Sequence, residues 1–312
     1  MDAISGLLSG PRAREAFVLR CELDGAWALR VQDEAPLALM AVLRGSAYVT
    51  ATGAEPVHLG PGDVALARGP APYDVASTPG LQPSVVIHPG QRCTTLDGTD
   101  LRDVFHRGVR TWGTTESGST SILVGTYTRA GEVGRRTLAA LPELLVLDSA
   151  DWHSPLLDHL ADELASDEPG QSAVLDRLLD LLVIGVLRAW FARAEAPPGW
   201  YAARGDRVVG AALRLIHDDV ARPWSLAALA SAASVSRATL ARRFADLVGQ
   251  TPMAYLTEWR LALAADLLAD PDLTLAEVAR RVGYATPFAL SAAFKRQYGV
   301  SPRQHRLEQA TA

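Results

Sequence analysis

Basic side chains gather in two short stretches that lie about fifty residues apart near the end of the chain. The first stretch holds Arg237, Arg242 and Arg243, and the second holds Lys295 and Arg296. An arginine on a helix can donate both arms of its guanidinium to guanine, and either residue type can pair with phosphates. These residues therefore indicate contact with DNA, although a basic helix face that is merely exposed to water would have the same composition.

The first half of the chain holds the side chains that could take part in redox or metal chemistry. Cys21 and Cys93 are its two cysteines, and Cys21 is either a redox-active thiol or a small buried apolar residue. A zinc hypothesis rests on His88, Cys93 and His106, but their spacing matches no standard zinc pattern. We therefore expect no catalytic residue, no metal ion and no cofactor.

The basic stretches belong to a sequence repeat. The repeated residues are Leu240, Phe244, Gly249 and Pro252 in the first copy, and Leu290, Phe294, Gly299 and Pro302 in the second. Helix-start signals accompany the copies: a hydroxyl residue precedes a proline at Thr251, Thr286 and Ser301, and Thr274 can form a capping box with Glu277. Short turns at residues 233–235 and 282–284 separate the helices. This pattern predicts two helix-turn-helix units.

The segment from about Val208 to Arg306 resembles the DNA-binding domain of the AraC/XylS family of bacterial transcription regulators. The resemblance rests on the motifs Trp224–Ala230, Ser236–Phe244, Gly249–Pro252, Arg260–Leu268, Ala279–Tyr284, Ala293–Arg296 and Gly299–Pro302. It implies two helix-turn-helix units joined by one long helix, here residues 252–268. It also implies that both recognition helices enter successive major-groove turns on one face of the DNA.

The resemblance also implies which residues read bases. The family's base-reading positions fall on Ala238, Ala241 and Arg242 in the first unit and on Phe288, Ala289 and Ala292 in the second. The second set departs from the common pattern because it has no hydrogen-bonding side chain, so we expect Arg237 and Arg242 to supply most of the polar readout. The second unit would contact thymine methyls or position the protein through Lys295 and Arg296 on phosphates. The full predicted contact set is Arg237, Ala238, Thr239, Ala241, Arg242, Arg243, Thr286, Phe288, Ala289, Ser291, Ala292, Lys295 and Arg296.

Charge is distributed unevenly along the chain. Its formal net charge of −5 by itself argues against nucleic-acid binding. From residue 202 onward, however, fourteen Lys and Arg face ten Asp and Glu, a net charge of +4, which leaves −9 for the remainder. DNA contact is therefore expected only at the C-terminal end.

Length and composition predict a globular protein of two domains. A chain of 312 residues with 48% hydrophobic and 21% charged residues exceeds one typical core. No signal peptide and no apolar run of membrane-spanning length is found, and two cysteines do not form a disulfide framework. We therefore expect a cytoplasmic protein that makes no contact with membranes.

Short apolar or alternating segments separated by Gly and Pro fill the first 150 residues. The predicted strands are residues 17–21, 27–31, 37–43, 46–50, 57–59, 63–67, 84–88 and 122–126. Such strands predict a sandwich or a small barrel. The stretch Leu59–Gly69 resembles the turn-and-strand signature of cupin barrels, which commonly form the sensory domain in this regulator family.

The N-terminal residues are similar to the cupin-type branch of the family that includes regulators responding to reactive chlorine species through cysteine oxidation. The similarity lies in Met1–Leu8 and Cys21–Trp27, but the second cysteine of those sensors falls at Ser121 here, so Cys93 would have to replace it from a loop. A small molecule bound between the sheets is the other expectation. The predicted sensing residues are Cys21, Trp27, Tyr48, Tyr73, Cys93, Trp112 and Tyr127.

From about residue 142 the pattern changes to helix. The second predicted helix is apolar on two faces, so it is either buried within its own domain or packed against a second copy, and the resemblance favours a homodimer. The predicted domains are a cupin-like sensory β-domain at 1–150, a helical hairpin at 151–195, a linker at 196–206 and the DNA-binding domain at 207–312.

The predicted fold class is a two-domain α+β chain, with an N-terminal cupin-like β-barrel and helical hairpin and a C-terminal all-α tandem helix-turn-helix domain. The predicted function is sequence-specific regulation of transcription on double-stranded promoter DNA, controlled by an effector or an oxidant. RNA polymerase would be a further partner. The alternatives are a cupin-fold enzyme with an accessory helical domain, which the lack of metal ligands disfavours, and an architectural DNA binder, which the strand-rich first half disfavours.

Overall fold

The computed structural model describes residues 17–108, 110–193 and 201–311, and these residues form two compact units. The β unit comprises residues 17–129 and 141–190. The helical unit comprises residues 130–140 and the described residues from 191 onward. Residues 1–8, which carried part of the resemblance, and residues 196–200 of the predicted linker lie outside the described residues.

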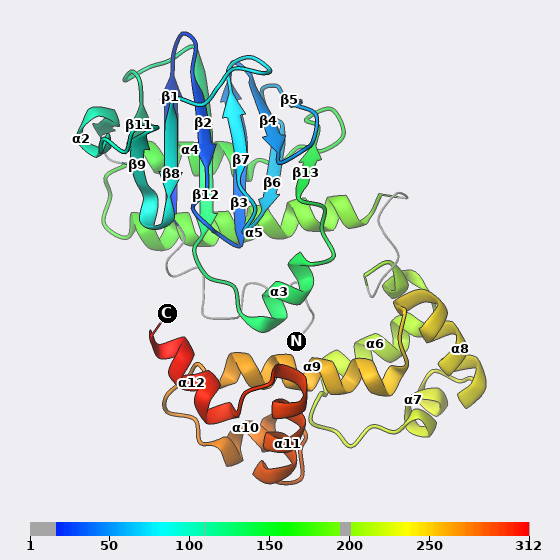
Figure 1. Cartoon of the computed structure of the whole chain (residues 1–312). Helices are drawn as coiled ribbons and strands as arrows, with labels where there is room; N and C mark the ends of the chain where they lie inside the picture. The colour runs from blue at the N-terminus through cyan, green and yellow to red at the C-terminus, as the bar shows by residue number, and fades with distance from the viewer. Residues whose placement is uncertain (1–16, 109, 194–200, 312) are drawn as a thin grey trace. The chain divides into compact units, whose positions relative to one another are not determined.

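Two sheets form the β unit (Figure 1). The seven-stranded sheet has the order β10 (His106–Gly108), β11 (Thr111–Gly113), β1 (Phe17–Leu23), β12 (Thr120–Tyr127), β3 (Leu37–Arg44), β6 (Val64–Arg68) and β13 (Leu144–Leu147). The six-stranded sheet has the order β5 (Val57–Leu59), β4 (Ala47–Ala51), β7 (Tyr73–Ala76), β2 (Ala28–Val31), β8 (Val85–His88) and β9 (Arg92–Thr95). The apolar core lies between the two sheets and takes side chains from both, for example Met40 and Ile122 from one and Leu29 and Val75 from the other.

Helices cover the outer face of the seven-stranded sheet, which explains why β3 is buried along most of its length. These are α4 (Leu156–Ala165) and α5 (Gln171–Phe191), while η2 (Pro89–Gln91) and α2 (Arg102–Phe105) lie near β9. Gly125 of β12 permits the close approach of α5, because a Cβ at this position would lie 2.5 Å from the Leu179 side chain. The Tyr127 hydroxyl donates to Asp180 of α5 at 3.1 Å.

Each of the eight predicted strands is present, with small shifts at the ends, as β1 to β6, β8 and β12. The sequence prediction missed the others, and it was wrong to begin the helical region at about residue 142. Leu144–Leu147 forms strand β13, which pairs antiparallel with β6. A four-residue apolar run is too short to show a period, and here it is buried at a sheet edge.

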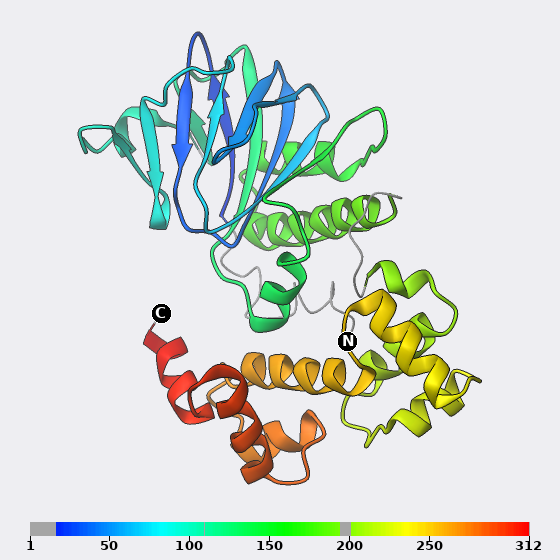
Figure 2. The same ribbon diagram turned by 45° about the vertical axis from the view of Figure 1, so that its right-hand side comes forward.

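The helical unit contains η3 (Ala202–Gly205), α6 (Val209–Asp218), α7 (Leu226–Ala232), α8 (Arg237–Val248), α9 (Pro252–Leu267), α10 (Leu275–Arg281), α11 (Pro287–Tyr298) and α12 (Pro302–Thr311). Helices α7 and α8 form one helix-turn-helix, α10 and α11 form the second, and α9 runs between them (Figure 2). Phe244 and Trp259 belong to the core of the first, and Leu261 and Phe294 to the core of the second. The predicted tandem repeat is therefore confirmed.

Helix starts in this unit follow the capping signals in the sequence. The side chains of Ser236, Thr251 and Thr286 each accept a backbone N–H in the first turn of α8, α9 and α11. Thr274 and Glu277 form the predicted capping box of α10. Local sequence therefore fixes where both recognition helices and the connecting helix begin.

Helix α3 (Glu132–Leu138) was not predicted. It follows β12 and precedes β13 in sequence, yet it belongs to the helical unit. A segment inserted between two strands of the β unit is thus part of the unit that holds the two helix-turn-helix motifs.

Candidate DNA-reading surface and sensory cavity

Helix α8 buries one face and exposes its basic residues. Leu240 and Phe244 are fully buried four residues apart, which fixes the rotation of the helix. The predicted contact residues all avoid the core: Arg237, Ala238, Arg242 and Arg243 are exposed, and Thr239 and Ala241 are half-buried.

Helix α11 repeats this arrangement with different chemistry on its surface. Leu290 and Phe294 are fully buried. Of the predicted contact residues, Thr286, Phe288, Ala289, Ala292, Lys295 and Arg296 are exposed, and Ser291 is half-buried. Phe288 is 83% exposed. This phenyl ring therefore presents a large apolar surface to solvent.

Not every arginine of α8 is equally available. Arg243 forms an ion pair with Asp206, whose carboxylate also caps α6 through the backbone N–H groups of Val208 and Val209. These backbone hydrogen bonds, and then Arg243, hold the pKa of Asp206 below its usual value. Within the described part of the chain, Arg237 and Arg242 have no ion pair.

Two arginines that the sequence analysis did not single out hold the helical unit together. Arg260 of α9 donates to the carbonyls of Val220 at 2.9 Å and Arg222 at 2.7 Å. Arg306 of α12 donates to the carbonyls of Leu268 at 3.0 Å and Leu273 at 2.6 Å. Arg260 fixes a loop against α9, and Arg306 fixes the end of α9 and the loop after it against α12, so both guanidinium groups have structural partners.

Helix α3 docks on α9 through polar and apolar contacts. The Asp266 carboxylate accepts the N–H groups of Glu132 and Val133 and so caps α3. Arg136 pairs with Glu258 at 2.7 Å, and the Val133 side chain is fully buried in the same core as Trp259. Burial raises the pKa of Asp266 to about 6, although the two N–H donors oppose this shift.

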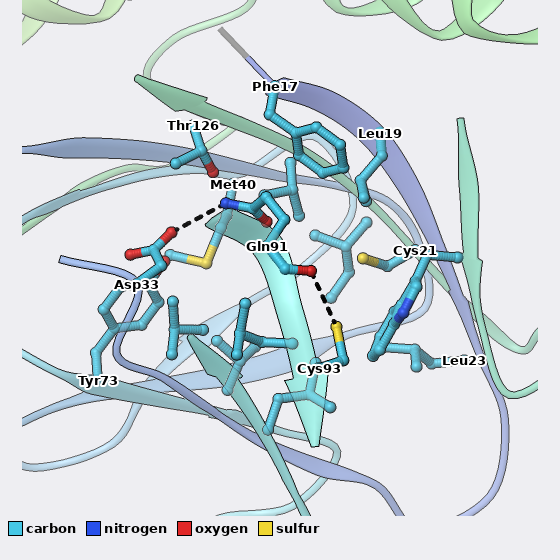
Figure 3. Close-up of a pocket in the computed structure, with 17 residues that line it drawn as sticks. Phe17, Leu19, Cys21, Leu23, Asp33, Met40, Tyr73, Gln91, Cys93 and Thr126 are labelled. Atoms are coloured by element: carbon cyan, nitrogen blue, oxygen red, sulfur yellow. Dashed lines mark hydrogen bonds between the residues drawn. The ribbon is translucent and has the colours of Figure 1, made fainter. Parts of the chain in front are cut away.

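A cavity opens between the two sheets of the β unit (Figure 3). It holds about 710 Å³ of space, including its opening to solvent, and most of its lining is apolar. Polar groups in the lining come from Asp33, Tyr73, Gln91 and Thr126, which Figure 3 labels together with Cys21 and Leu23. The Gln91 side-chain amide donates to Asp33 at 3.3 Å, and the Ala35 backbone N–H donates to the same carboxylate at 3.1 Å.

The cavity brings together four of the seven predicted sensing residues, namely Cys21, Tyr73, Cys93 and Trp112. It does not include the other three. Trp27 is buried in the core, Tyr48 packs edge-on against His58, and Tyr127 is bonded to Asp180 of α5. Sequence reasoning missed Asp33 and Gln91, since nothing in their local sequence marks them as cavity residues.

The two thiols enter the cavity from different sheets. Cys21 lies on β1, and Cys93 lies on β9 rather than on the predicted loop. Both are buried, and burial, Cys93 and Glu22 together raise the pKa of Cys21 to about 12. The thiolate is the reactive form, so Cys21 is held in its less reactive state at neutral pH. Ser121, which stands where the similar chlorine-responsive regulators have their second cysteine, donates to Glu22 at 2.7 Å.

Metal-ligating groups do not gather in the described ranges. No group of three or more His, Cys, Asp or Glu there is placed to hold a metal ion. The His88 ring instead contacts Gln32 at 3.3 Å and Thr94 at 2.9 Å. The zinc hypothesis for His88, Cys93 and His106 gains no support from this geometry. Across the same residues, no helix has both the length and the apolar character that crossing a bilayer requires.

Comparison with known proteins finds a family model that matches each of the two units. A cupin family model matches residues 2–192, and a helix-turn-helix domain model matches residues 229–308. A putative AraC-like transcription regulator of Streptomyces lividans is 33% identical over 98% of each chain. The RCS-specific HTH-type transcriptional activator RclR of Escherichia coli is 30% identical over 60% of this chain and 68% of its own.

Among solved structures, the DNA-binding domain of AdpA, in complex with a target DNA, is 32% identical, with a TM-score of 0.33 over 34% of this chain and 96% of that one. The family models together span most of the chain, and the relative from Streptomyces lividans matches it nearly end to end. This chain therefore belongs to the AraC-like transcription regulators, with a cupin-type N-terminal domain and a C-terminal helix-turn-helix domain.

Proposed function

We propose that this protein binds double-stranded promoter DNA sequence-specifically through α8 and α11, and that it acts in the cytoplasm as a regulator and not as an enzyme. The observation that carries the proposal is the pair of helices α8 and α11, which flank α9 in the chain. Each is capped and buries one Leu and one Phe, and all of the predicted contact residues on them are exposed or half-buried. RNA polymerase would be a further partner.

Selection of bound fragments from random DNA by the purified full chain tests this proposal. We expect one enriched motif with two parts about one helical turn apart, because the two helices would enter successive major-groove turns. Binding should weaken steeply with salt. The proposal fails if the folded chain retards no fragment at low salt or enriches no sequence.

The effector site of this regulator is the cavity between the sheets. Support comes from its position between the two sheets, its mostly apolar lining and the few polar groups it contains, which together are typical of small-molecule sites. Oxidation of Cys21 remains an alternative signal, but its raised pKa slows any reaction through the thiolate. A gel shift of Cys21→Ser with and without oxidant separates these signals, since the variant would lose a response that depends on the thiol.

Helix α3 provides a covalent route from the β unit to the helical unit. Residues 128–143 connect β12 to β13, so a change in the cavity wall at Thr126 is only a few residues from a helix that packs on α9. Val133→Ala loosens this docking. We expect it to change the operator affinity of the full chain at least threefold. Val278→Ala, an equal truncation in the second core, should lower stability but change the operator affinity less than threefold. Equal effects would remove α3 from the mechanism.

A homodimer formed through α5 fits its surface. Val174 is 43% exposed and Leu181 is 51% exposed on this helix. Because they are seven positions apart, about two helical turns, they lie on the same face. Large apolar side chains exposed in this way favour a protein partner, here a second copy. Leu181→Glu should convert a dimer to a monomer in analytical ultracentrifugation. A wild-type chain that sediments as a monomer at micromolar concentration would contradict the dimer.

A further inference from the structure

The polar groups of the cavity carry one sign of charge. Asp33 is the acidic residue of the lining, and among the residues that the structure describes no Lys, Arg or His lines the cavity. The remaining lining is aliphatic, aromatic, amide, hydroxyl or thiol in character. Within its described lining, the cavity therefore has no group that could neutralise an anionic ligand, and Asp33 would place a carboxylate near such a ligand's charge.

Asp33 is also able to accept more hydrogen bonds than it receives. Ala35 donates to one of its oxygens and Gln91 to the other. A carboxylate has about four acceptor sites on its two oxygens, so each oxygen retains capacity for a further donor. Asp33 is half-buried, which leaves this capacity facing the cavity and its opening.

Further polar groups lie on the same side. Tyr73 lies near enough to Asp33 to feel its charge, and Figure 3 shows Thr126 on the same side of the view, with Cys21 and Leu23 on the other. The Tyr73 hydroxyl has no hydrogen-bond partner within the described part of the chain. Burial and the neighbouring Asp33 charge raise the pKa of Tyr73, so its hydroxyl remains neutral and able to donate or accept. The cavity thus has a side with acceptors and a hydroxyl, and the rest of its described lining is apolar apart from two thiols and the Trp112 indole N–H, a buried donor without a hydrogen-bond partner there.

We propose that the effector is an amphiphile with an apolar body and a positively charged or neutral hydrogen-bond-donating head, an amine before an alcohol, which binds Asp33, and that anionic amphiphiles are excluded. This inference rests on the cavity being the effector site, as proposed above. The apolar body would lie along the aliphatic walls, for example Met40, Val75 and Ile122. The head would donate to the Asp33 carboxylate, a charge-assisted hydrogen bond when the head is an ammonium group.

Three probes of equal chain length test the charge of the head. The full chain is titrated by calorimetry with n-octylamine, 1-octanol and octanoate, each below its micelle concentration and at neutral pH. We expect octylammonium to bind about tenfold or more tightly than octanol. Octanoate should bind more weakly than octanol. Octanoate binding as tightly as octylammonium would overturn the inference.

Two variants assign the preference to Asp33. Asp33→Asn retains an oxygen for the Ala35 N–H and removes the charge, so it should reduce the octylammonium preference to within about threefold of octanol. Glu34→Gln is the matched control, because it removes the adjacent carboxylate, which is exposed and does not line the cavity. The control should keep the wild-type preference. Retention of the preference in Asp33→Asn, or its loss in Glu34→Gln, would contradict the role of Asp33.

A cavity-filling variant separates this inference from the proposed function. Ile122→Trp would occupy the cavity, so it should abolish binding of every probe that binds the wild-type chain. If the folded wild-type chain retards its operator but binds none of the three probes, the amphiphile inference fails and the proposed DNA binding stands. If all three bind equally and Ile122→Trp removes them, the site stands and only the charge selectivity is wrong.

Discussion

Helices α8 and α11 occupy equivalent places in the repeat, and each buries a leucine and a phenylalanine four residues apart. Their exposed faces differ. Helix α8 presents arginines at its start and middle, whereas α11 presents Phe288 and two alanines, with basic residues only in its last turn. One core pattern therefore supports two surfaces, and the shared fold does not require a shared role.

The inserted helix contacts α9, which joins the two helix-turn-helix units. Helix α3 is capped by Asp266 near the end of α9. Burial raises the pKa of Tyr298 at the end of α11 and lowers the pKa of His305 in α12, and charged residues of α3 contribute to both shifts. Val133 of α3, however, is buried in the core of the first helix-turn-helix, and Arg136 pairs with Glu258 of α9. The inserted helix therefore contacts residues associated with both helix-turn-helix units.

The largest expected effect tests whether the two cores are equivalent. Phe244→Ala and Phe294→Ala each remove a fully buried ring, so each should lower the free energy of unfolding by about 3–5 kcal/mol. Phe288→Ala removes the same side chain from an exposed position of α11 and should change stability by no more than about 0.5 kcal/mol. Urea unfolding followed by circular dichroism measures all three. A large loss for Phe288→Ala would show that its ring is packed and not presented to a partner.

The helical unit could be predicted closely from sequence because its signals are local. The hydroxyl caps at Ser236, Thr251 and Thr286 each act within three residues, and they set the starts of three helices. The buried leucine and phenylalanine repeat at helical spacing, which identified the core face of both recognition helices. Side chains on the other face follow from that assignment.

The cavity and the docking of α3 could not be predicted in the same way. Asp33 and Gln91 are 58 residues apart, and Asp266 is 134 residues from Glu132, so no local pattern records either contact. Helix α3 has only seven residues and no side-chain cap of its own, because Asp266 of a distant helix provides it. The strand β13 was misread for a related reason, since a four-residue apolar run has no measurable period.

The docking of α3 on α9 should depend on pH, because Asp266 caps α3 and has a raised pKa. The pKa of Asp266 is raised from 3.8 to about 6, so between these values the unfolded chain loses the proton while the folded chain keeps it. Stability of the docked helix should therefore be greatest below about pH 4 and fall as the pH rises to about 6, by an upper limit of roughly 3 kcal/mol.

Hydrogen exchange of residues 132–138, corrected for intrinsic rates, measures this fall in stability. Asp266→Asn should flatten it, because the asparagine does not titrate. Asp270→Asn removes a nearby exposed carboxylate and should leave the profile unchanged. An identical profile for Asp266→Asn and the wild-type chain would assign the pH dependence to another group.

Base readout by the first unit has an expected effect of similar or smaller size. Arg242→Ala should weaken binding to the selected operator by about 1–3 kcal/mol and relax sequence preference at one position. Ala292→Ser on α11 should have little effect, because that helix would contact methyl groups. Arg303→Ala, an exposed arginine of α12, controls for the loss of one positive charge. If only Ala292→Ser changed affinity, the assignment of discrimination to α8 would be wrong.

The smallest effect concerns the basic residues in the last turn of α11. Lys295 is exposed and belongs to the same helix as the apolar contact residues, so its ammonium group would pair with a phosphate and not with a base. Lys295→Ala should weaken binding to all sequences alike and reduce the slope of log affinity against log salt by about 1. Arg242→Ala, by contrast, should reduce the discrimination between the operator and an operator altered at the contacted position, at every salt concentration. Should Lys295→Ala alter sequence preference while leaving the salt slope intact, the second unit would be reading bases through its polar residues, and the two helices would be alike in role as well as in fold.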